Sequence, residues 1–282
     1  MPDVYQKIKT KRLVLTGAKA EELLDPLRTG MPALDSIYDD KVRFKPTPKG
    51  PTYRILKTTE VDSYETTPTA LALTKALRGK NRPTPAAIAA ALSHKPLAGE
   101  NFVGSARKEV RLSLATARTE QFSDVSKLIS SLPSVDAMVT LSTQTNPSSN
   151  RAQQEKRNIH VAGFLYAASR EADNDFHLIV GRDLKAAPEM YMTMVVSGLP
   201  SANSPAFGSL NTARTAYEEF FGKNLPGAGY HFYHPPIPVQ IDGSLFFNTT
   251  HSTGQQTGPP SLKSRMPTIW EVHPISSVKL GP

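Results

Sequence analysis

Two short strings of the sequence place an acid and a histidine two residues apart, a spacing that could support chemistry. Glu271 and His273 lie near the C-terminus beside the only tryptophan, Trp270, and Asp175 and His177 lie farther back in the chain. A carboxylate beside an imidazole can transfer a proton or bind a metal ion. Either pair can also be a hydrogen-bonded structural unit, because buried polar groups need partners.

His251 is the best-placed neighbour of Glu271 and His273, because it directly follows the predicted strand that precedes theirs. Two histidines and one carboxylate suit zinc or another divalent metal with an open position for water. One hypothesis is therefore a metal-dependent, nuclease-like hydrolase, with these three residues as its catalytic and metal-binding candidates. We favour the interpretation that Glu271 and His273 form a structural pair at the rim of the fold, with no cofactor.

The string 230-YHFYHPP-236 is a further candidate binding site. We expect a loop there, in which His231, Tyr233 and His234 stack on bases or hold a metal with His251, or in which the rings simply cap the core. The chain has no cysteine, which excludes disulfides, thiolate zinc sites and cysteine nucleophiles. It also has no G-x-S-x-G, G-x-G-x-x-G or Walker sequence, so the common nucleophile and nucleotide sites are not expected.

Five strands are predicted in the C-terminal half from its apolar runs and alternations, and one helix lies between the third and fourth. The strands span 159–171, 175–183, 190–200, 237–248 and 268–280, and the helix spans 209–222. Three strands, a helix and two strands is the order of an OB barrel. Trp270 should face the interior, Glu271 and His273 should face outward, and the two acid–histidine pairs should stand about 10 Å apart.

The N-terminal half is predicted to be a small, partly extended helical region that ends in a polar linker over 142–158. A helical hairpin over 67–95 carries Arg78, Lys80 and Arg82 in its turn, as candidate binding residues. It could read DNA, but its alanine-rich second helix favours packing or a protein partner. A strand over 109–118 and a capped helix over 123–132 are also expected.

The predicted fold class is therefore β-rich α+β, with two domains. Residues 1–150 form the basic N-terminal region with its linker, and residues 151–282 form the OB-like barrel. The net charge of +8 is uneven: residues 1–150 contain 22 basic and 15 acidic residues, and residues 151–282 contain 11 and 10. Attraction to a polyanion should therefore lie in the N-terminal half. No apolar run reaches 18 residues and none suits a signal peptide, so we expect a soluble, by default cytoplasmic, protein without a membrane partner.

Residues 159–280 resemble a family of uncharacterised bacterial proteins with an OB-like fold. The resemblance rests on NDFHLIV, TMVV followed by GLP, IDGSLFFNTTH and GPPSLKS…WEVHPI, in this order. The family pattern reads D-x-H-L, T-M-I-V-E-x-P, V-x-G-x-L-F-F-D-x-x-H and W-E-I-H-P. Asn248 replaces an aspartate of this pattern, and Ser197 replaces a glutamate. The resemblance implies an OB-like fold and no activity. Asp175, His177 and the Trp270–His273 string are the motif residues that indicate this fold.

The sequence favours a non-enzymatic binding or assembly protein. An N-terminal half this rich in proline would struggle to build a core alone, so it should pack against the barrel or against other subunits. The partner would then be a protein or a second copy of the chain. The alternatives are a single-stranded nucleic-acid-binding protein, which the OB module and the basic N-terminal half suggest, and the metal-dependent hydrolase centred on His251, Glu271 and His273.

Overall fold

The fold is built on one large mixed β-sheet. The computed structural model describes residues 5–7, 13–15, 40–58, 60–61, 100–140, 150–248 and 258–282. The strands of the sheet are β3 (Asp40–Phe44), β4 (Tyr53–Lys57), β5 (Thr119–Phe122), β6 (Asn158–Arg170), β7 (Phe176–Gly181), β8 (Tyr191–Val196), β9 (His231–Phe247) and β10 (Trp270–Leu280). A separate two-stranded sheet contains β1 (Tyr5–Lys7) and β2 (Leu13–Leu15).

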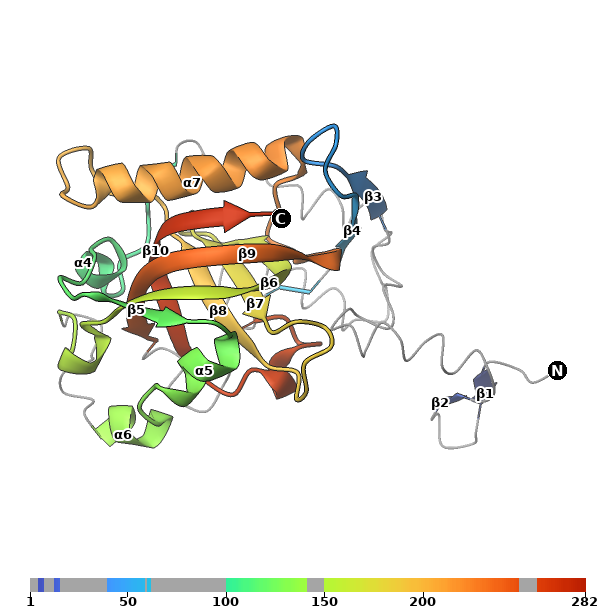
Figure 1. Cartoon of the computed structure of the whole chain (residues 1–282), viewed down its shortest axis with the longest axis horizontal. Helices are drawn as coiled ribbons and strands as arrows, with labels where there is room; N and C mark the ends of the chain where they lie inside the picture. The colour runs from blue at the N-terminus through green and yellow to red at the C-terminus, as the bar shows by residue number, and fades with distance from the viewer. Residues whose placement is uncertain are drawn as a thin grey trace.

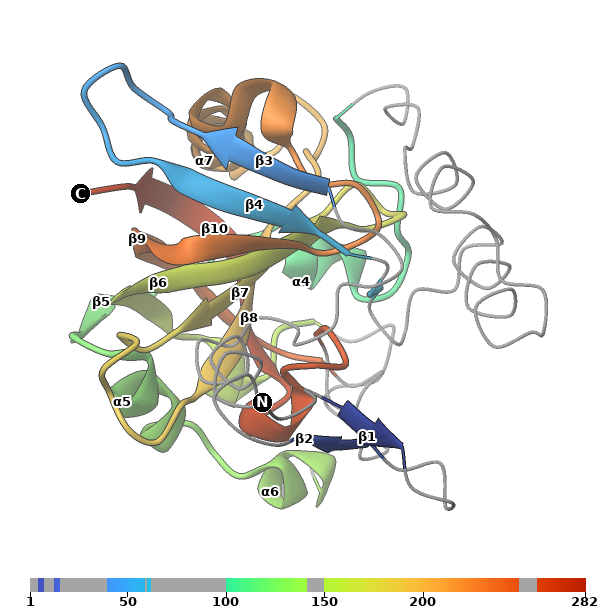
Figure 2. The same ribbon diagram turned by 90° about the vertical axis from the view of Figure 1, so that its right-hand side faces the viewer.

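Five strands of this sheet close into a ring. The eight strands follow the order β3-β4-β9-β10-β8-β7-β6-β5, and β9 also pairs with β6, which joins the ends of the segment β9-β10-β8-β7-β6 (Figures 1 and 2). All contacts within the ring are antiparallel except β8 with β10, which is parallel and registers at Met194 and Val272. β3 and β4 extend the sheet beyond β9, and β5 extends it beyond β6.

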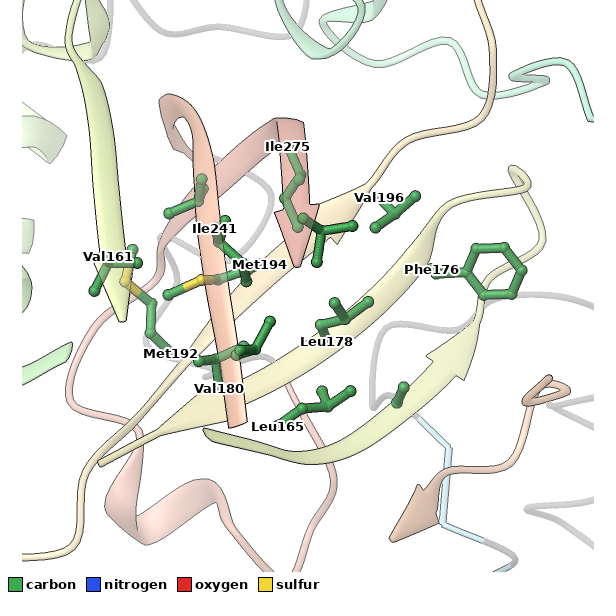
Figure 3. Close-up of a cluster of buried hydrophobic side chains, with 14 of the residues drawn as sticks. Val161, Leu165, Phe176, Leu178, Val180, Met192, Met194, Val196, Ile241 and Ile275 are labelled. Carbon is green, nitrogen blue, oxygen red and sulfur yellow. The ribbon is translucent and has the colours of Figure 1, made fainter. Parts of the chain in front are cut away.

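The ring encloses the main hydrophobic core. Side chains from β6, β7, β8, β9 and β10 fill it, and Figure 3 labels ten of them, including Val161, Leu178, Met194, Ile241 and Ile275. Trp270 also belongs to this core, where its ring meets Phe247 at 5.2 Å. The inward direction predicted for Trp270 is therefore confirmed.

In the described part of the chain the helices are few, and most are short. The long helix α7 (Phe207–Phe221) lies between β8 and β9 in the chain, as predicted, and ends at Gly222. It covers the ring through aromatic contacts, such as Tyr217 with Phe176 at 4.9 Å (Figure 1). The predicted capped helix is α5 (Val125–Ser130), in which the Asp124 side chain accepts a hydrogen bond from Ser126 N. The others are α4 (Lys108–Arg111), α6 (Val135–Thr140) and the 3-10 turns Gln153–Glu155, Gly222–Asn224 and Lys263–Arg265.

Two local predictions were wrong. The expected strand over 109–118 is a single helical turn, α4, followed by irregular chain, and it begins at Arg107 in the left-handed conformation. Val110 and Leu112 are buried as their alternation predicted, but no strand pairs with them. The expected loop over 230–236 is the beginning of β9, because its backbone pairs with β4 and β6.

Strands from both halves of the chain share one sheet. β3 and β4 come from residues 40–57 and β5 from residues 119–122, and they pair with β9 and β6 of the C-terminal half. The helical hairpin around Arg78, Lys80 and Arg82 lies outside the described residues, as does the first part of the predicted linker. The boundary at residue 150 stays a prediction. Among the described residues no helix is both long enough and apolar enough to span a membrane.

Candidate functional site

The two acid–histidine strings meet in one buried cluster. The two ring nitrogens of His273 face different carboxylates: Nδ1 lies 3.3 Å from Glu271 Oε2, and Nε2 lies 3.4 Å from Asp175 Oδ2. All three side chains have an exposed fraction of 0%. The predicted distance of about 10 Å between the pairs was therefore wrong, and Glu271 and His273, on the face of β10 opposite Trp270, are buried rather than exposed.

The register of the strands accounts for this approach. β8 does lie between β7 and β10, but Asp175 comes just before the first paired residue of β7, and the pairing of β10 shifts between Val272 and Ile275. These two irregular positions let the side chains of Asp175 and His273 converge. The side chains of Asp175, Glu271 and His273 are buried because the segment before and within α4 covers this side of the ring. Phe102 and Leu112 of that segment are buried there.

Arg111 of α4 connects the cluster to the covering segment. Its guanidinium Nη1 donates to Asp173 Oδ2 at 2.7 Å and lies 3.9 Å from Asp175 Oδ2. The ring of Phe246 lies 5.8 Å from the same guanidinium and 5.2 Å from the ring of His273. We call Arg111, Asp173, Asp175, Asn248, Glu271 and His273 the buried polar cluster.

The protonation of the cluster follows from its burial. Burial, followed by the nearby Asp173 carboxylate, raises the pKa of Asp175 to about 8, although Arg111 opposes the shift. Burial, with the positive charge of Arg111 next in weight, lowers the pKa of His273 well below its usual value. At neutral pH Asp175 is therefore mainly protonated and His273 is neutral, so the cluster avoids most of the cost of burying unpaired charges.

The two departures from the family pattern both lie at this cluster. Asn248 Nδ2 donates to Glu271 Oε1 at 2.7 Å, a bond that an ionised aspartate at this position could not donate. Ser197 is buried, and its side-chain Oγ donates a hydrogen bond to the carbonyl oxygen of Arg111 at 3.3 Å. Both residues therefore supply neutral hydrogen-bonding groups beside buried charges.

A second buried ion pair lies next to the cluster. Arg107 donates through Nη1 to Glu155 Oε1 at 2.7 Å and through Nη2 to Glu155 Oε2 at 2.6 Å. Glu155 also accepts from Ala152 N and Phe247 N, and its side chain is fully buried. The Arg107 guanidinium lies 4.8 Å from the ring of Phe246, which links this pair to the polar cluster. The pair therefore ties α4 and the Gln153–Glu155 turn to the end of β9.

The sequence reasoning missed this pair, and it missed Arg111 and Asp173. Glu155 lies in a polar stretch that we interpreted as a linker, and its partner is 48 residues away. No local pattern distinguishes such residues from solvated ones. Only the contact across the fold identifies them.

The geometry of Asp175, Glu271 and His273 does not suit a metal centre. Because Nδ1 and Nε2 of His273 point to different carboxylates, Glu271, His273 and Asp175 do not direct their lone pairs at one common point. Within the described ranges no group of three or more histidines and acids could hold a metal ion. The other ligand of that hypothesis, His251, lies outside the described residues.

The remaining predicted residues lie at three separate places. His177 Nδ1 is 3.8 Å from Glu171 Oε1 at the beginning of β7. Tyr233 is fully buried under α7, where its ring meets Phe221 at 5.2 Å. His231 is buried and His234 half-buried in β9, opposite Lys57 and Arg54 of β4. The structure therefore does not bring the residues of the 230–236 string together as one site.

A shallow hollow of about 250 Å³ lies at another place, between the beginning of α5 and strands β6 and β9. Arg182 and Asp124 line it, and Arg182 Nε lies 3.1 Å from both carboxylate oxygens of Asp124. Arg182 also donates to the carbonyl oxygens of Ala187 and Pro188. The charged groups of the hollow are thus already bonded to one another or to the backbone.

Four exposed basic residues lie on the hairpin of β3 and β4. Arg43 and Arg54 are directly opposite each other in the register of the two strands, and both are exposed. Lys45 and Lys49, in the turn between the strands, are exposed as well. We call residues 40–57 the basic hairpin. A signal for it was present in the sequence, because KVRFK and YRILK each place an arginine between apolar residues on both sides of a proline-rich turn.

Comparison with known proteins adds no identification. No protein-family model, no curated protein and no solved structure matches this chain. The resemblance of residues 159–280 to an uncharacterised bacterial family stays a prediction. Function must therefore be argued from the geometry of the buried polar cluster and the basic hairpin.

Proposed function

We propose that this protein is a non-enzymatic binding and assembly protein that takes a segment of a protein partner at the edge of its sheet. The observation that carries the proposal is the position of β3. It is the terminal strand of the eight-stranded sheet, and in the described part of the chain β4 alone pairs with it. An edge strand carries backbone donors and acceptors on its outer side, and an extended peptide can pair with them as an added strand.

The state of the buried polar cluster supports a non-enzymatic role. Glu271, His273 and Asp175 are fully buried and face one another, so a substrate has no access to their polar atoms. Both ring nitrogens of His273 are enclosed with the side chain, Nδ1 beside Glu271 and Nε2 beside Asp175, so neither meets a molecule bound at the surface. The cluster instead holds β7, β9, β10 and α4 together at one end of the ring.

We also propose that the ring is an OB-like barrel. Numbered along the chain, its strands follow the order 1-2-3-5-4 and then return to 1, and α7 lies between the third and fourth. This order, with its parallel contact between the third and fifth strands, supports the proposal. OB-like modules bind their ligands on their surfaces, which agrees with a binding role.

A selection of random peptides against the full-length chain tests the binding proposal. We expect the selected peptides to slow amide hydrogen exchange in β3 by at least about tenfold, because an added strand would bond to its backbone. Exchange in β5, the terminal strand at the other end of the sheet, is the internal control and should not change. Selected peptides that leave β3 exchange unaltered, or that protect the ends of β7 and β10 instead, would overturn the proposal.

A further inference from the structure

The two faces of the basic hairpin have different environments. On one face, Phe44 and Tyr53 are buried, and the ring of Phe44 stacks on Phe221 of α7 at 5.4 Å and meets Phe220 at 5.6 Å. Because side chains alternate along a strand, Arg43 and Arg54 leave from the opposite face. The hairpin lies beside α7 (Figure 2), and this packing therefore fixes the face of the sheet from which the two arginines leave.

The two arginines stand where they repel each other. Residues directly opposite in an antiparallel pair have Cβ atoms about 4.5–5.5 Å apart, and like charges at such positions destabilise the sheet. Arg43 is opposite Arg54, and Arg54 is opposite His234 of β9, so the row crosses three strands. A strand added beyond β3 would place its own residue next in this row, beside Arg43.

Within the described part of the chain, no ion pair neutralises Arg43, Arg54, Lys45 or Lys49. All described salt bridges lie elsewhere, at such places as Arg107–Glu155, Arg157–Glu120 and Arg265–Glu189. The hairpin therefore presents a basic surface next to a strand edge. Its complement is an extended ligand with negative charges.

The chemistry of the surface favours an acidic peptide over a single-stranded nucleic acid. Proteins that bind single strands combine basic residues with aromatic rings on which the bases stack. The large exposed apolar side chains among the described residues are Val103, Val139 and Leu184, and none of them is aromatic. An acidic peptide needs no stacking platform, because it can use the backbone of β3 and the charges of the arginine row together.

We infer that the partner segment is an extended acidic peptide that pairs with the outer edge of β3. Its carboxylates, two residues apart, lie on the face of Arg43 and form ion pairs with the basic hairpin. This inference rests on the proposed function and adds the chemical class of the partner. Binding relieves the repulsion between Arg43 and Arg54, because a carboxylate next in the row attracts both guanidinium groups.

The probe is a fluorescent peptide of alternating glutamate and threonine, titrated into the full-length chain at low salt. We expect it to bind, with an affinity that falls as salt is added and that drops about fivefold to tenfold in Arg43→Gln and again in Arg43→Gln/Arg54→Gln. The same peptide with glutamine in place of glutamate should bind at least about tenfold more weakly. Lys127→Gln makes the same charge change on the exposed face of α5 and should leave binding unchanged.

A thymidine oligonucleotide of equal length is measured in parallel. If it binds in an Arg43-dependent way and the glutamate peptide does not, the surface is a phosphate site and the inference is overturned. Glutamate-peptide binding that ignores both arginine substitutions also overturns it. In either case, neutral peptides that still protect β3 from hydrogen exchange would leave the proposed function standing, so the two failures can be told apart.

Discussion

The charged groups of the buried polar cluster and those of the basic hairpin lie in opposite environments. In the cluster, the carboxylates of Asp175 and Glu271 stand on either side of His273, out of contact with water. In the hairpin, Arg43 and Arg54 stand side by side, exposed, and without an ion pair among the described residues. The sequence string that looked most like an active site is thus buried, and the charged residues of the basic hairpin are exposed.

The two regions differ in whether their charged groups are available to a binding partner. Charged groups that are buried and bonded to one another stabilise one arrangement of the chain. When one partner is lost, the other is left buried without its counter-charge. Like charges placed directly opposite each other at the surface do not stabilise the sheet, and in our proposal they serve binding instead. Substitutions that are matched in chemistry but differ in burial test whether burial decides the role of each charged group.

The largest effect is expected at the Arg107–Glu155 pair. Glu155→Gln leaves the Arg107 guanidinium buried without its counter-charge, and we expect the free energy of unfolding to fall by about 3–5 kcal/mol. The matched control is Glu120→Gln, because Arg157 also donates two hydrogen bonds to Glu120, through Nε at 2.7 Å and Nη2 at 2.6 Å, in an exposed position. The Glu120→Gln control should lower the free energy of unfolding by about 0–1 kcal/mol. Urea unfolding measures both, and equal losses would contradict the role we assign to burial.

A smaller effect is expected from the titration of Asp175. Between its ordinary pKa of 3.8 and its folded pKa of about 8, the folded protein keeps a proton that the unfolded chain has lost. Stability therefore falls as pH rises through this window, by at most about 1.4 kcal/mol per pH unit. His273 acts in the other direction: its pKa is lowered, so its contribution to stability is lost only as pH falls below 6.5.

Between pH 6.5 and about 8, the titration of Asp175 therefore changes the stability, whereas the titration of His273 does not. We expect urea unfolding of the wild type to show decreasing stability across this interval, and Asp175→Asn to remove this decrease, because asparagine resembles the protonated acid. Asp183→Asn, in an exposed turn, is the control and should keep the wild-type slope. An unchanged slope in Asp175→Asn would mean that Asp175 is ionised throughout.

The sequence predicted the ring strands because each is marked by an apolar run of its own. The α7 and α5 predictions succeeded for the same local reason, with Gly222 and Asp124 at their ends. The first part of β9 could not be predicted, since Pro235 and Pro236 have no backbone N–H and argue against a strand. Its pairing with β4 involves a segment far away in the chain, which no local pattern reports.

The candidate site was found in part, and its environment was not. The motifs around Asp175 and His273 marked residues that do meet, yet alternation along β10 predicted an outward-facing, wet side for Glu271. That rule assumes that one face of a strand meets solvent. Here the segment that contains Phe102, Arg111 and Leu112 covers the second face, and nothing in its sequence says where it packs.

The smallest effect is expected in the basic hairpin, and its sign is opposite to that at Arg107–Glu155. Arg43→Glu replaces a repelling cross-strand pair with an attracting one beside Arg54, so we expect stability to rise by about 0.2–1 kcal/mol at low salt. Lys49→Glu makes the same charge change in the turn, opposite no strand residue, and should have a smaller effect. Added salt should remove the gain, because these charges are exposed. Measured by urea unfolding, a loss of stability in Arg43→Glu would show that Arg43 serves the fold, and a gain would mean that the chain keeps this arginine at the expense of stability, as expected of a residue retained for binding.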